Sequence, residues 1–450
     1  MLSDVIAALA TPPGVSAVAL LRLTGREAYD VAAAVLEPFT ADPPRTARLA
    51  AARDPRNGEE LDRVLYVTYR APASYTGEDT VEISSHGGLL VPGGVLGALF
   101  AAGARQATRG EFTRRALLNG KIDLLQAEAI GDLVAATAPA QRRAALHQLE
   151  RGLSNRVGEL RDKVLELESL VCYEIDFPEE DDGPVSTEQI EATAEKLECS
   201  LTQLLGTASE GERLTEGAVC VIAGLPNVGK SSLFNALLGK ERAIVAPKPG
   251  TTRDAIEAAA DCGGFPFRLI DTAGLRDTDD DIERMGVEVS HRYLVGADVV
   301  LFCAEAGRAI ADEELAFIRK VSAPTLIVRT KADLRPGGGD TEDDLGDVSV
   351  SATESTGLAE LRAELASLAF SRLSTAGGVV ACVTRERHRV ALHSAREEVA
   401  AFRAARASGL EGAVAATHLR AALSALEDIV GVVTTDDVLE RVFATFCVGK

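Results

Sequence analysis

A glycine-rich loop between an apolar run and a helix-like segment holds the residues that most directly predict chemistry. The run 219–223 is mainly apolar, and Gly224-Leu225-Pro226-Asn227-Val228-Gly229-Lys230-Ser231 follows it. Glycines in such a loop let backbone N–H groups wrap around phosphate oxygens. Lys230 can place its charge on the β- and γ-phosphates, and the Ser231 hydroxyl can ligate Mg²⁺. The order strand, loop, helix predicts a P-loop; the alternative is a glycine-rich turn before an ordinary helix.

Four further motifs follow the loop in the order typical of a GTPase domain. Gly250-Thr251-Thr252 offers hydroxyls for Mg²⁺, and Asp271-Thr272-Ala273-Gly274 ends a second strand where it can reach the metal and the γ-phosphate. In Thr330-Lys331-Ala332-Asp333, the aspartate can accept both the N1–H and the N2–H of guanine, a pair of donors that adenine lacks. Ser351-Ala352-Thr353 suits a last contact to the base. Together these motifs predict a GTP-hydrolysing α/β domain over residues 216–373.

The predicted nucleotide contacts extend along all five motifs. Mg²⁺ is assigned to the hydroxyls of Ser231 and Thr252, and Lys230 is assigned a catalytic part because its charge meets the phosphates. Thr330 stands where asparagine is usual, and since it offers a hydroxyl but no amide, lower affinity for the base is expected. The predicted GTP contacts are Asn227, Val228, Gly229, Lys230, Ser231, Ser232, Gly250, Thr251, Thr252, Asp271, Thr272, Ala273, Gly274, Thr330, Lys331, Asp333, Ser351, Ala352 and Thr353.

The segments around this domain belong to two other structural classes. Residues 1–118 alternate short strands with helices, which predicts an α+β domain. Its strands are expected at 15–23, 61–69 and 80–84, and its helices at 26–36 and 92–104. Within this domain His86 is interpreted as a hydrogen-bonded polar residue, with catalysis or metal binding as the alternative.

Long amphipathic helices are expected on both sides of the GTPase domain. Apolar residues at three- and four-residue spacing predict helices within 119–215 and again within 374–450. The acidic segment 176–184 interrupts the first set and is either a solvated turn or a cation site. These patterns predict one all-α domain interrupted by an insertion, although the sequence leaves open whether the two halves pair.

The aromatic and apolar character of the last eight residues predicts that this segment docks on the protein, because a frayed tail is usually polar. Within it, Cys447 is interpreted as a small buried hydrophobe, with a nucleophile as the alternative.

Charge and composition exclude several classes of protein. The chain has a net charge of −21, which argues against a general nucleic-acid binder and requires a local basic face or a basic partner for any contact with RNA. Seven cysteines, scattered and without a Cys-x-x-Cys pair, predict reduced thiols in a cytoplasmic protein without structural zinc. The sequence shows neither a signal peptide nor an apolar run of transmembrane length, so no stable membrane insertion is expected.

With these pieces placed, the chain resembles the tRNA-modification GTPase family MnmE, also called TrmE, over essentially its full length. The resemblance implies a folate-binding N-terminal domain (1–118) that also forms a homodimer, a discontinuous helical domain (119–215 and 374–450) and the inserted G domain (216–373). The motifs that carry it are Ala10-Thr11-Pro12-Pro13-Gly14, Leu21-Arg22-Leu23-Thr24-Gly25, Tyr75-Thr76-Gly77-Glu78-Asp79, His86-Gly87-Gly88, Leu118-Asn119-Gly120-Lys121-Ile122-Asp123-Leu124 and Phe446-Cys447-Val448-Gly449-Lys450.

The resemblance also implies a partner, a substrate and a one-carbon donor. It implies a heterotetramer with the FAD-containing protein MnmG that adds an aminomethyl-type group, carboxymethylaminomethyl where glycine is used, to C5 of the wobble uridine of certain tRNAs. A tetrahydrofolate derivative, 5-formyl- or 5,10-methylene-tetrahydrofolate, supplies the carbon. The implied folate contacts are Arg22, Glu82, Lys121 and Lys450, and Cys447 is a candidate for the modification chemistry.

GTP hydrolysis in this chain needs a substitute for the glutamine of Ras-like enzymes, because Leu275 stands at that position. The family implies that Glu283 orients the attacking water. It also implies a K⁺ ion that offsets charge on the phosphoryl group, held by Asn227, Ala246, Lys248 and Thr251. It further places Ala246, Pro247, Lys248 and Pro249 among the GTP contacts. The competing hypothesis is a regulatory GTPase switch, in ribosome assembly or stress signalling, without modification chemistry.

Overall fold

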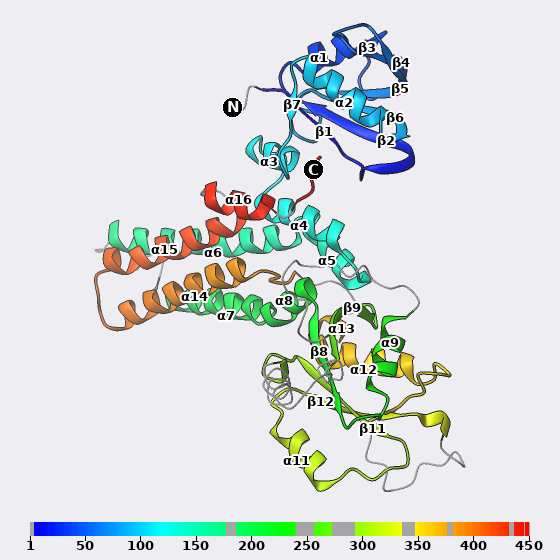
Figure 1. The fold of residues 1–450 in the computed structure, drawn as a ribbon. Coiled ribbons are helices and arrows are strands. Elements are labelled where there is room, and N and C mark those ends of the chain that lie inside the picture. Colours follow the sequence, from blue (N-terminus) through cyan, green and yellow to red (C-terminus); the bar gives the residue numbers. More distant parts are fainter. Residues whose placement is uncertain are drawn as a thin grey trace, which may run out of the picture. The chain divides into compact units, whose positions relative to one another are not determined.

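The computed structural model describes residues 4–176, 186–239, 256–271, 293–334, 347–375, 381–431, 436–444 and 446–449. Packing divides the chain into two compact units, Met1–Gly131 with Val430–Lys450, and Asp132–Ile429 (Figure 1). The first unit therefore combines segments from opposite ends of the sequence. The domain boundaries expected from the sequence, at 118, 215 and 373, remain predictions.

A seven-stranded sheet forms the centre of the first unit, with the strand order β3-β4-β5-β6-β2-β1-β7. Side chains alternate between its two faces. Leu21, Leu23, Val81 and Ile83 pack in one core with α1 (Ala28–Val35) and α2 (Val91–Ala101), whereas Ile6 pairs with Phe112 of α3 (Glu111–Leu118) in a second core. The strands are β1 Ile6–Leu9, β2 Gly14–Thr24, β3 Leu36–Glu37, β4 Arg48–Arg53, β5 Glu60–Tyr69, β6 Thr80–Gly88 and β7 Arg105–Gln106.

The end of the chain completes the first unit. Phe443 of α16 (Asp436–Ala444) and Phe446 beyond it are buried against Leu124 and Ala127 of α4 (Leu124–Ala135). The close approach of Phe446 depends on glycine, because a Cβ on Gly131 would lie 3.1 Å from the Phe446 ring. The prediction that this apolar segment docks is confirmed.

Long helices from both sides of the nucleotide-binding segment pair within the second unit (Figure 1). Arg403 forms ion pairs with Glu191 at 2.6 Å and Glu198 at 2.5 Å, which ties α14 to α7, and Arg420 of α15 reaches Glu168 of α6 at 2.9 Å. The two halves that the sequence left open therefore meet. The helices of this part are α5 Pro139–Leu149, α6 Gly152–Asp176, α7 Thr187–Leu205, α8 Ala208–Glu216, α13 Ser371–Thr375, α14 Glu386–Ala407 and α15 Gly412–Val430.

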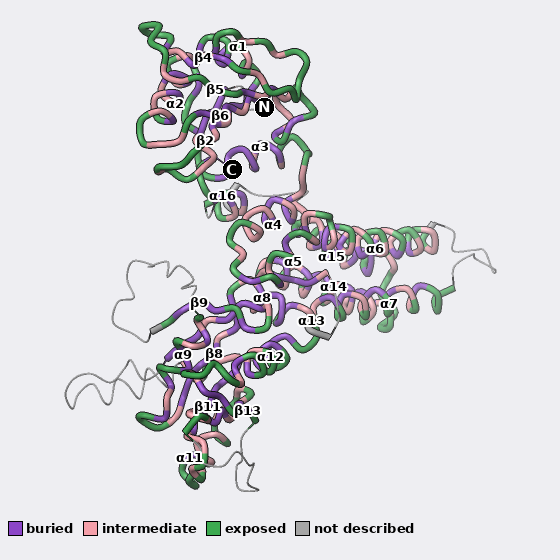
Figure 2. The backbone as a smooth tube through the Cα atoms, turned by 90° about the vertical axis from the view of Figure 1, so that its right-hand side faces the viewer, coloured by how far each residue is buried: buried purple, intermediate pink, exposed green. Residues whose placement is uncertain are grey.

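A six-stranded sheet forms the nucleotide-binding part of the second unit, in the order β13-β12-β11-β8-β10-β9. All neighbouring strands are parallel except β9 and β10, and both faces of the central strands are buried, as the purple tube of β8 and β11 shows (Figure 2). The strands are β8 Ala218–Gly224, β9 Ile256–Cys262, β10 Phe265–Asp271, β11 Val299–Glu305, β12 Thr325–Thr330 and β13 Val348–Ser349, with α9 Lys230–Leu238, α11 Asp312–Lys320, α12 Leu358–Ala369 and the 3₁₀ turn η2 Ala332–Leu334.

The fold class is multidomain, with an α+β N-terminal part, a helical part and an inserted α/β P-loop part. The expected strands and helices in 1–118 occur, with bounds shifted by a few residues at their ends. No helix among the described residues is long and apolar enough to cross a membrane.

Candidate functional site

The loop between β8 and α9 has the backbone of a phosphate-binding loop. Gly224 adopts φ +138°, and a Cβ there would lie 2.4 Å from the carbonyl oxygen of Cys303 on β11, so only glycine fits. Asn227 and Gly229 also have positive φ, at 64° and 98°. These turns bring the chain from the carboxyl end of β8 into the first turn of α9, whose N–H groups and dipole favour an anion.

Lys230, at the start of α9, is buried and folds back over this loop. Its ammonium donates to the carbonyl oxygens of Gly224 at 3.0 Å and Leu225 at 2.7 Å. The charge is therefore held by the loop that the sequence assigns to phosphate, where it can meet a phosphate oxygen.

The Ser231 hydroxyl and the Asp271 carboxylate meet at the carboxyl ends of β8 and β10. Ser231 Oγ donates to Asp271 Oδ2 at 2.8 Å, and Asp271 is 2% exposed. A hydroxyl and a carboxylate in contact supply two oxygens of the kind that Mg²⁺ prefers. These two residues therefore fit the metal that the sequence predicts there, while Thr252 lies outside the described residues.

The base-recognition motifs converge at the ends of β12 and β13. Ser351 Oγ donates to Asp333 Oδ1 at 2.6 Å, and this hydrogen bond lowers the pKa of Asp333, so the carboxylate stays ionised and able to accept. Thr353 Oγ1 lies 3.0 Å from Ser351 Oγ and extends the same network.

Thr330 and Lys331 join this base site to the phosphate loop. The Thr330 hydroxyl lies within hydrogen-bond distance of the carbonyl oxygens of Val228 and Ala304. Lys331 reaches Glu305 at 3.1 Å, and its stem lies beside Gly229, where a Cβ would be 4.0 Å from Lys331 Cγ. The contact of the Thr330 hydroxyl with these two carbonyls was not predicted, because the sequence indicates only that Thr330 belongs to a base-recognition motif.

Several predicted contacts lie outside the described residues. These are the residues 246–252 of the K⁺ and γ-phosphate contacts, Thr272, Ala273, Gly274 and the proposed water-orienting Glu283. Of the four implied K⁺ ligands, only Asn227 is described, and its side chain is exposed. Ser232 is exposed on α9, and Ala352 lies next to the buried Ser351.

A second polar cluster lies on the sheet of the first unit, where Arg22 and Glu82 are register partners on β2 and β6. The guanidinium donates to Glu82 Oε1 from Nε at 3.0 Å and from Nη2 at 2.7 Å. The Tyr69 hydroxyl donates to the other oxygen at 3.1 Å. Burial and the negative Glu82 raise the pKa of Tyr69, which keeps this phenol a donor.

Two aromatic rings face the guanidinium of this cluster. Arg22 Cζ lies 5.7 Å from the ring centroids of both Tyr75 and Phe112, within the range of cation–π attraction. The Tyr75 hydroxyl is 2.9 Å from Thr113 Oγ1, so α3 holds this ring. Tyr69 and Phe112 were not singled out from the sequence, because each reaches Arg22 or Glu82 only through the packed sheet and α3.

Lys121 lies beside the loop 71–79 that carries Tyr75. Its ammonium donates to the carbonyl oxygen of Pro72 at 2.9 Å, and a Cβ on Gly77 would be 3.3 Å from Lys121 Cγ. Lys121 is exposed, so its charge is accessible to a ligand. The loop thus connects two of the four residues implied in folate binding.

The chain end also reaches this cluster. Arg22 Nη1 lies 3.4 Å from the carbonyl oxygen of Gly449, and Gly110 N–H donates to the carbonyl of Cys447 at 3.3 Å. The Cys447 side chain is exposed, so its interpretation as a buried hydrophobe is wrong, because the backbone and not the thiol makes the contact. Lys450 lies outside the described residues.

His86 takes the structural part that the sequence favoured. Its Nδ1 lies 2.7 Å from Asp62 Oδ1, and its backbone N–H donates to Asp62 Oδ2 at 2.8 Å. These contacts join β6 to β5 at the exposed end of the sheet.

The chain is similar over its whole length to known proteins of one family. A family model described as the MnmE helical domain matches residues 124–447, and one described as the GTP-binding protein TrmE N-terminus matches residues 5–121. A tRNA modification GTPase MnmE from Moorella thermoacetica is 41% identical over 100% of both chains, and one from Aquifex aeolicus is 40% identical over 99% of both. A crystal structure of Era from Aquifex aeolicus is 26% identical over 33% of this chain and 55% of that chain, and its TM-score of 0.26 adds nothing to the fold described above. The full-length matches show that the chain belongs to the family of tRNA modification GTPases called MnmE or TrmE.

Proposed function

We propose that this GTP-hydrolysing enzyme modifies the wobble uridine of certain tRNAs in the cytoplasm, together with MnmG and a tetrahydrofolate one-carbon donor. The product carries an aminomethyl or carboxymethylaminomethyl group at C5. Relatives that match the whole chain are named tRNA modification GTPases. The observation that carries the proposal is that one chain holds a phosphate loop with the Ser231–Asp271 pair and also the half-buried Arg22–Glu82 pair.

In the G domain, we assign the charge of Lys230 to the β- and γ-phosphates, and Ser231, Thr252 and Asp271 to the magnesium side. K⁺ supplies positive charge beside the phosphates when it is bound, in the place of an arginine finger. We assign its binding to Asn227, Ala246, Lys248 and Thr251, and the orientation of water to Glu283.

K⁺ activation predicts faster GTP turnover by the full chain in KCl than in NaCl at equal ionic strength. Asn227→Ala is expected to reduce this difference, because its side-chain oxygen is the described candidate ligand. Equal rates of the wild-type protein in the two salts would remove K⁺ from the proposal and leave GTP hydrolysis itself untouched.

In the first unit, Glu82 suits the paired N–H donors of a pterin ring. A carboxylate offers about four acceptor positions. Arg22 and Tyr69 use three of them, so Glu82 keeps one position for a pterin donor, and a paired contact requires Tyr69 to give up its hydrogen bond. The cations of Arg22, Lys121 and Lys450 suit the acidic tail of a folate.

Folate binding is tested by calorimetry of the full chain with 5-formyl-tetrahydrofolate. Glu82→Gln is expected to weaken binding at least about tenfold, because an amide NH₂ replaces one carboxylate oxygen and a donor then meets the pterin donors. Asp62→Asn, which alters a carboxylate on the same sheet beside His86, is the matched control. Unchanged affinity in the Glu82 variant would remove this residue from the site.

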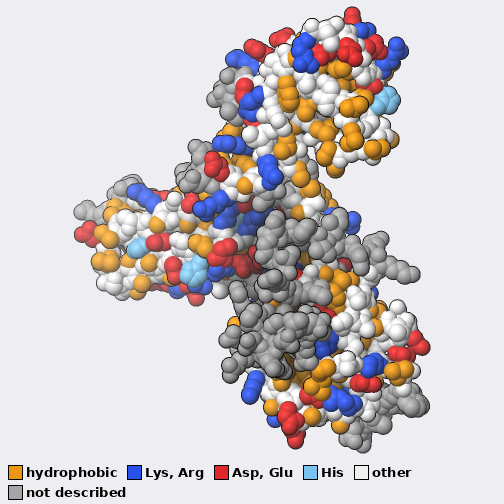
Figure 3. Space-filling view, viewed as in Figure 1, with side chains coloured by type: hydrophobic (Ala, Val, Ile, Leu, Met, Phe, Trp, Pro, Cys, Tyr) orange, Lys and Arg blue, Asp and Glu red, His pale blue; other side chains and the backbone are white. Residues whose placement is uncertain are grey.

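The homodimer of this proposal has a candidate surface in the first unit. Apolar side chains gather on one face of this unit in Figure 3. Leu49 and Leu65 are register partners on β4 and β5 and are 62% and 50% exposed, and Val18 on β2, two strands from β5, is 63% exposed. We propose that a second copy covers such a patch.

The tRNA product is tested by mass spectrometry of wobble uridines from cells that lack this protein. Loss of the C5 modification, restored by the wild-type gene, is expected. If the nucleosides of these cells do not differ from those of the parent cells, a regulatory GTPase is favoured.

A further inference from the structure

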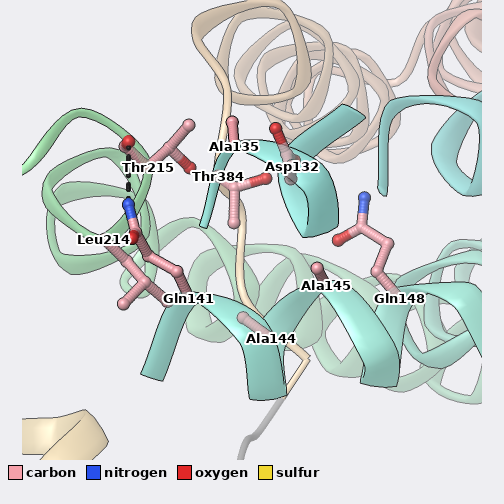
Figure 4. A pocket seen from close by; sticks show the side chains of 9 residues that line it. All are labelled: Asp132, Ala135, Gln141, Ala144, Ala145, Gln148, Leu214, Thr215 and Thr384. Atoms are coloured by element: carbon pink, nitrogen blue, oxygen red, sulfur yellow. Dashed lines mark hydrogen bonds between the residues drawn. The ribbon is translucent and has the colours of Figure 1, made fainter. Parts of the chain in front are cut away.

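Helix α5 in the second unit has one face turned toward a small pocket and another that is exposed. One face of the helix lines a cavity of about 80 Å³, and Figure 4 shows Gln141, Ala144, Ala145 and Gln148 on that side. The other face exposes Arg142 and Arg143. Within the described parts of the chain, neither guanidinium forms an ion pair.

The exposed face of α5 continues to the start of α6. The His147 ring lies against Gly152, where an added Cβ would come within 2.0 Å of His147 Cε1. Arg151 is exposed between the two helices, with φ +64°, and it too meets no carboxylate in the described ranges. We call Arg142, Arg143 and Arg151 the α5 arginine face.

The dipole of α6 adds to this charge. Arg151 directly precedes the first turn of this 25-residue helix, whose N-terminus is the positive end. Within α5 and its link to α6 (139–151), the acidic residue is Glu150, which is also exposed. The face therefore keeps a net positive charge in a chain of net charge −21.

Several other arginines of the helical part form ion pairs with carboxylates. Arg385 reaches Asp132 at 2.6 Å, Arg403 reaches Glu191 at 2.6 Å, and Arg156, one turn beyond the face, reaches Glu159 at 2.7 Å. These ion pairs join helices or stabilise one helix. The α5 arginine face makes no such contact among the described residues, so its charges are left for a partner.

We propose that the α5 arginine face binds the phosphate backbone of tRNA. This deepens the proposed function, because it rests on tRNA as the substrate, and it is independent of folate and K⁺. Arginine presents a planar fork of donors that matches phosphate oxygens, and its charge displaces counterions from RNA. In an acidic protein, a local cationic face also directs RNA toward itself and away from the negatively charged surface elsewhere.

The test compares two double variants of the full chain in binding to bulk tRNA by fluorescence anisotropy. R142A/R143A removes two charges from the α5 arginine face. R319A/K320A removes two charges from exposed neighbouring positions on α11, which also form no ion pair in the described ranges, so both variants have the same net charge. Affinity is measured between about 50 and 200 mM salt, where phosphate contacts dominate the salt dependence.

R142A/R143A is expected to weaken tRNA binding at least about tenfold and to reduce the slope of log K against log salt by about 1.5, while R319A/K320A stays near the wild-type protein. Equal effects of the two variants, or no effect of either, would overturn the proposal, as would a wild-type chain that does not bind tRNA. Circular dichroism melting checks that both variants fold. A vesicle of anionic lipid serves as a second probe, and a preference of the face for vesicles over tRNA would also overturn it.

The wobble uridines of cells that lack this protein are analysed alongside by mass spectrometry. Loss of the C5 modification, together with unchanged tRNA affinity of R142A/R143A, would reject the α5 arginine face and keep the proposed function, whereas an unchanged C5 modification would reject the proposed function itself.

Discussion

The Thr330 hydroxyl can donate to the carbonyl of Val228 in the phosphate loop or to that of Ala304 on β11, and the residue is 3% exposed. Thr330→Val keeps the shape and removes the donor. A buried acceptor left without a donor costs about 1–3 kcal/mol. We therefore expect the free energy of unfolding to fall by about 1–2 kcal/mol and GDP binding to weaken several-fold, measured by urea unfolding and calorimetry.

Thr330→Ser is the control for this prediction, because it keeps the hydroxyl and loses a methyl group. Equal losses in the two variants would show that the methyl contact, and not the hydrogen bond, joins the loop to the sheet.

Glu111 is the second residue whose contribution can be measured. Burial alone would raise its pKa, but hydrogen bonds from Arg105 and the Thr108 N–H outweigh burial and lower the pKa to about 2. The ionised form also reaches the buried Arg115 at 3.2 Å. A carboxylate whose pKa is lower in the folded state stabilises the fold above its unfolded pKa, here about 4.5, and this contribution is lost as the pH falls toward 2.

Glu111→Gln is therefore expected to destabilise the first unit by up to about 3 kcal/mol at neutral pH, with the difference from wild type shrinking between about pH 4.5 and 2. Urea unfolding at several pH values measures this. Glu37→Gln, at an exposed ion pair with Arg53, is the control and is expected to change stability by less than about 1 kcal/mol. A pH-independent loss in the Glu111 variant would contradict the assigned charge.

At the scale of elements, the turn from β8 into α9 depends on the close approach of β8 to β11. Gly224→Ala would place a Cβ 2.4 Å from the Cys303 carbonyl at a φ of +138°. We expect loss of several kcal/mol of stability and of most GTP binding, because both strands must separate. Gly158→Ala is the control, since a Cβ in the interior of α6 meets nothing within 4 Å there, and a gain of about 0.5–1 kcal/mol is expected. Normal GTP binding by the Gly224 variant would contradict the described turn.

The β9–β10 hairpin joins the nucleotide site to the helical part. Its tip contacts α5, where Ala140 N–H donates to the Gly264 carbonyl at 2.9 Å, and β10 ends at Asp271 beside Ser231. Gln141 fixes the same end of α5 by accepting from Ala138 N–H at 3.0 Å and donating to the Thr215 carbonyl at 3.3 Å. A shift of β10 near Asp271 would therefore be transmitted to α5 through the hydrogen bond between Ala140 and Gly264.

Local sequence predicted elements well where side-chain pattern and burial agree. The strand 80–84 lies within β6, and the helix expected at 92–104 corresponds to α2, Val91–Ala101. It did not predict β4, Arg48–Arg53, whose alanines favour a helix and which is a strand because β3 and β5 pair with it on either side. β9, Ile256–Cys262, is alanine-rich in the same way and is held by β10.

The two sites differ in how far sequence could predict them. The phosphate loop is a continuous segment, so its glycines, Lys230 and Ser231 predict the chemistry directly. The contacts of Tyr69 with Glu82 and of Phe112 with Arg22 join distant parts of the chain, and no local pattern marks them. Pairing of Arg22 with Glu82 also depends on the β2–β6 register, which a single sequence does not specify.

At the scale of the whole molecule, the first unit depends on residues from the end of the chain. Phe446 is 6% exposed and packs beside Gly131 and Gly110. Phe446→Ala is expected to destabilise this unit by about 3 kcal/mol through the cavity it leaves, and to weaken folate binding because Gly449 near Arg22 loses its anchor. Differential scanning calorimetry and folate calorimetry measure the two effects.

Val448→Ala, at a residue that is 40% exposed, is the matched control and is expected to have a small effect on both measurements. A Phe446 variant with wild-type melting and wild-type folate affinity would show that the docked end contributes nothing to the first unit.

The first unit is built from two segments that are translated at different times. Residues 4–131 leave the ribosome early, but the segment that packs beside Gly110 and reaches Arg22 is translated last. Domains generally fold as units while they emerge. A nascent chain stalled before residue 430 would thus carry its G domain segment complete and its Arg22 cluster unfinished, so premature termination would separate GTP hydrolysis from the proposed one-carbon step.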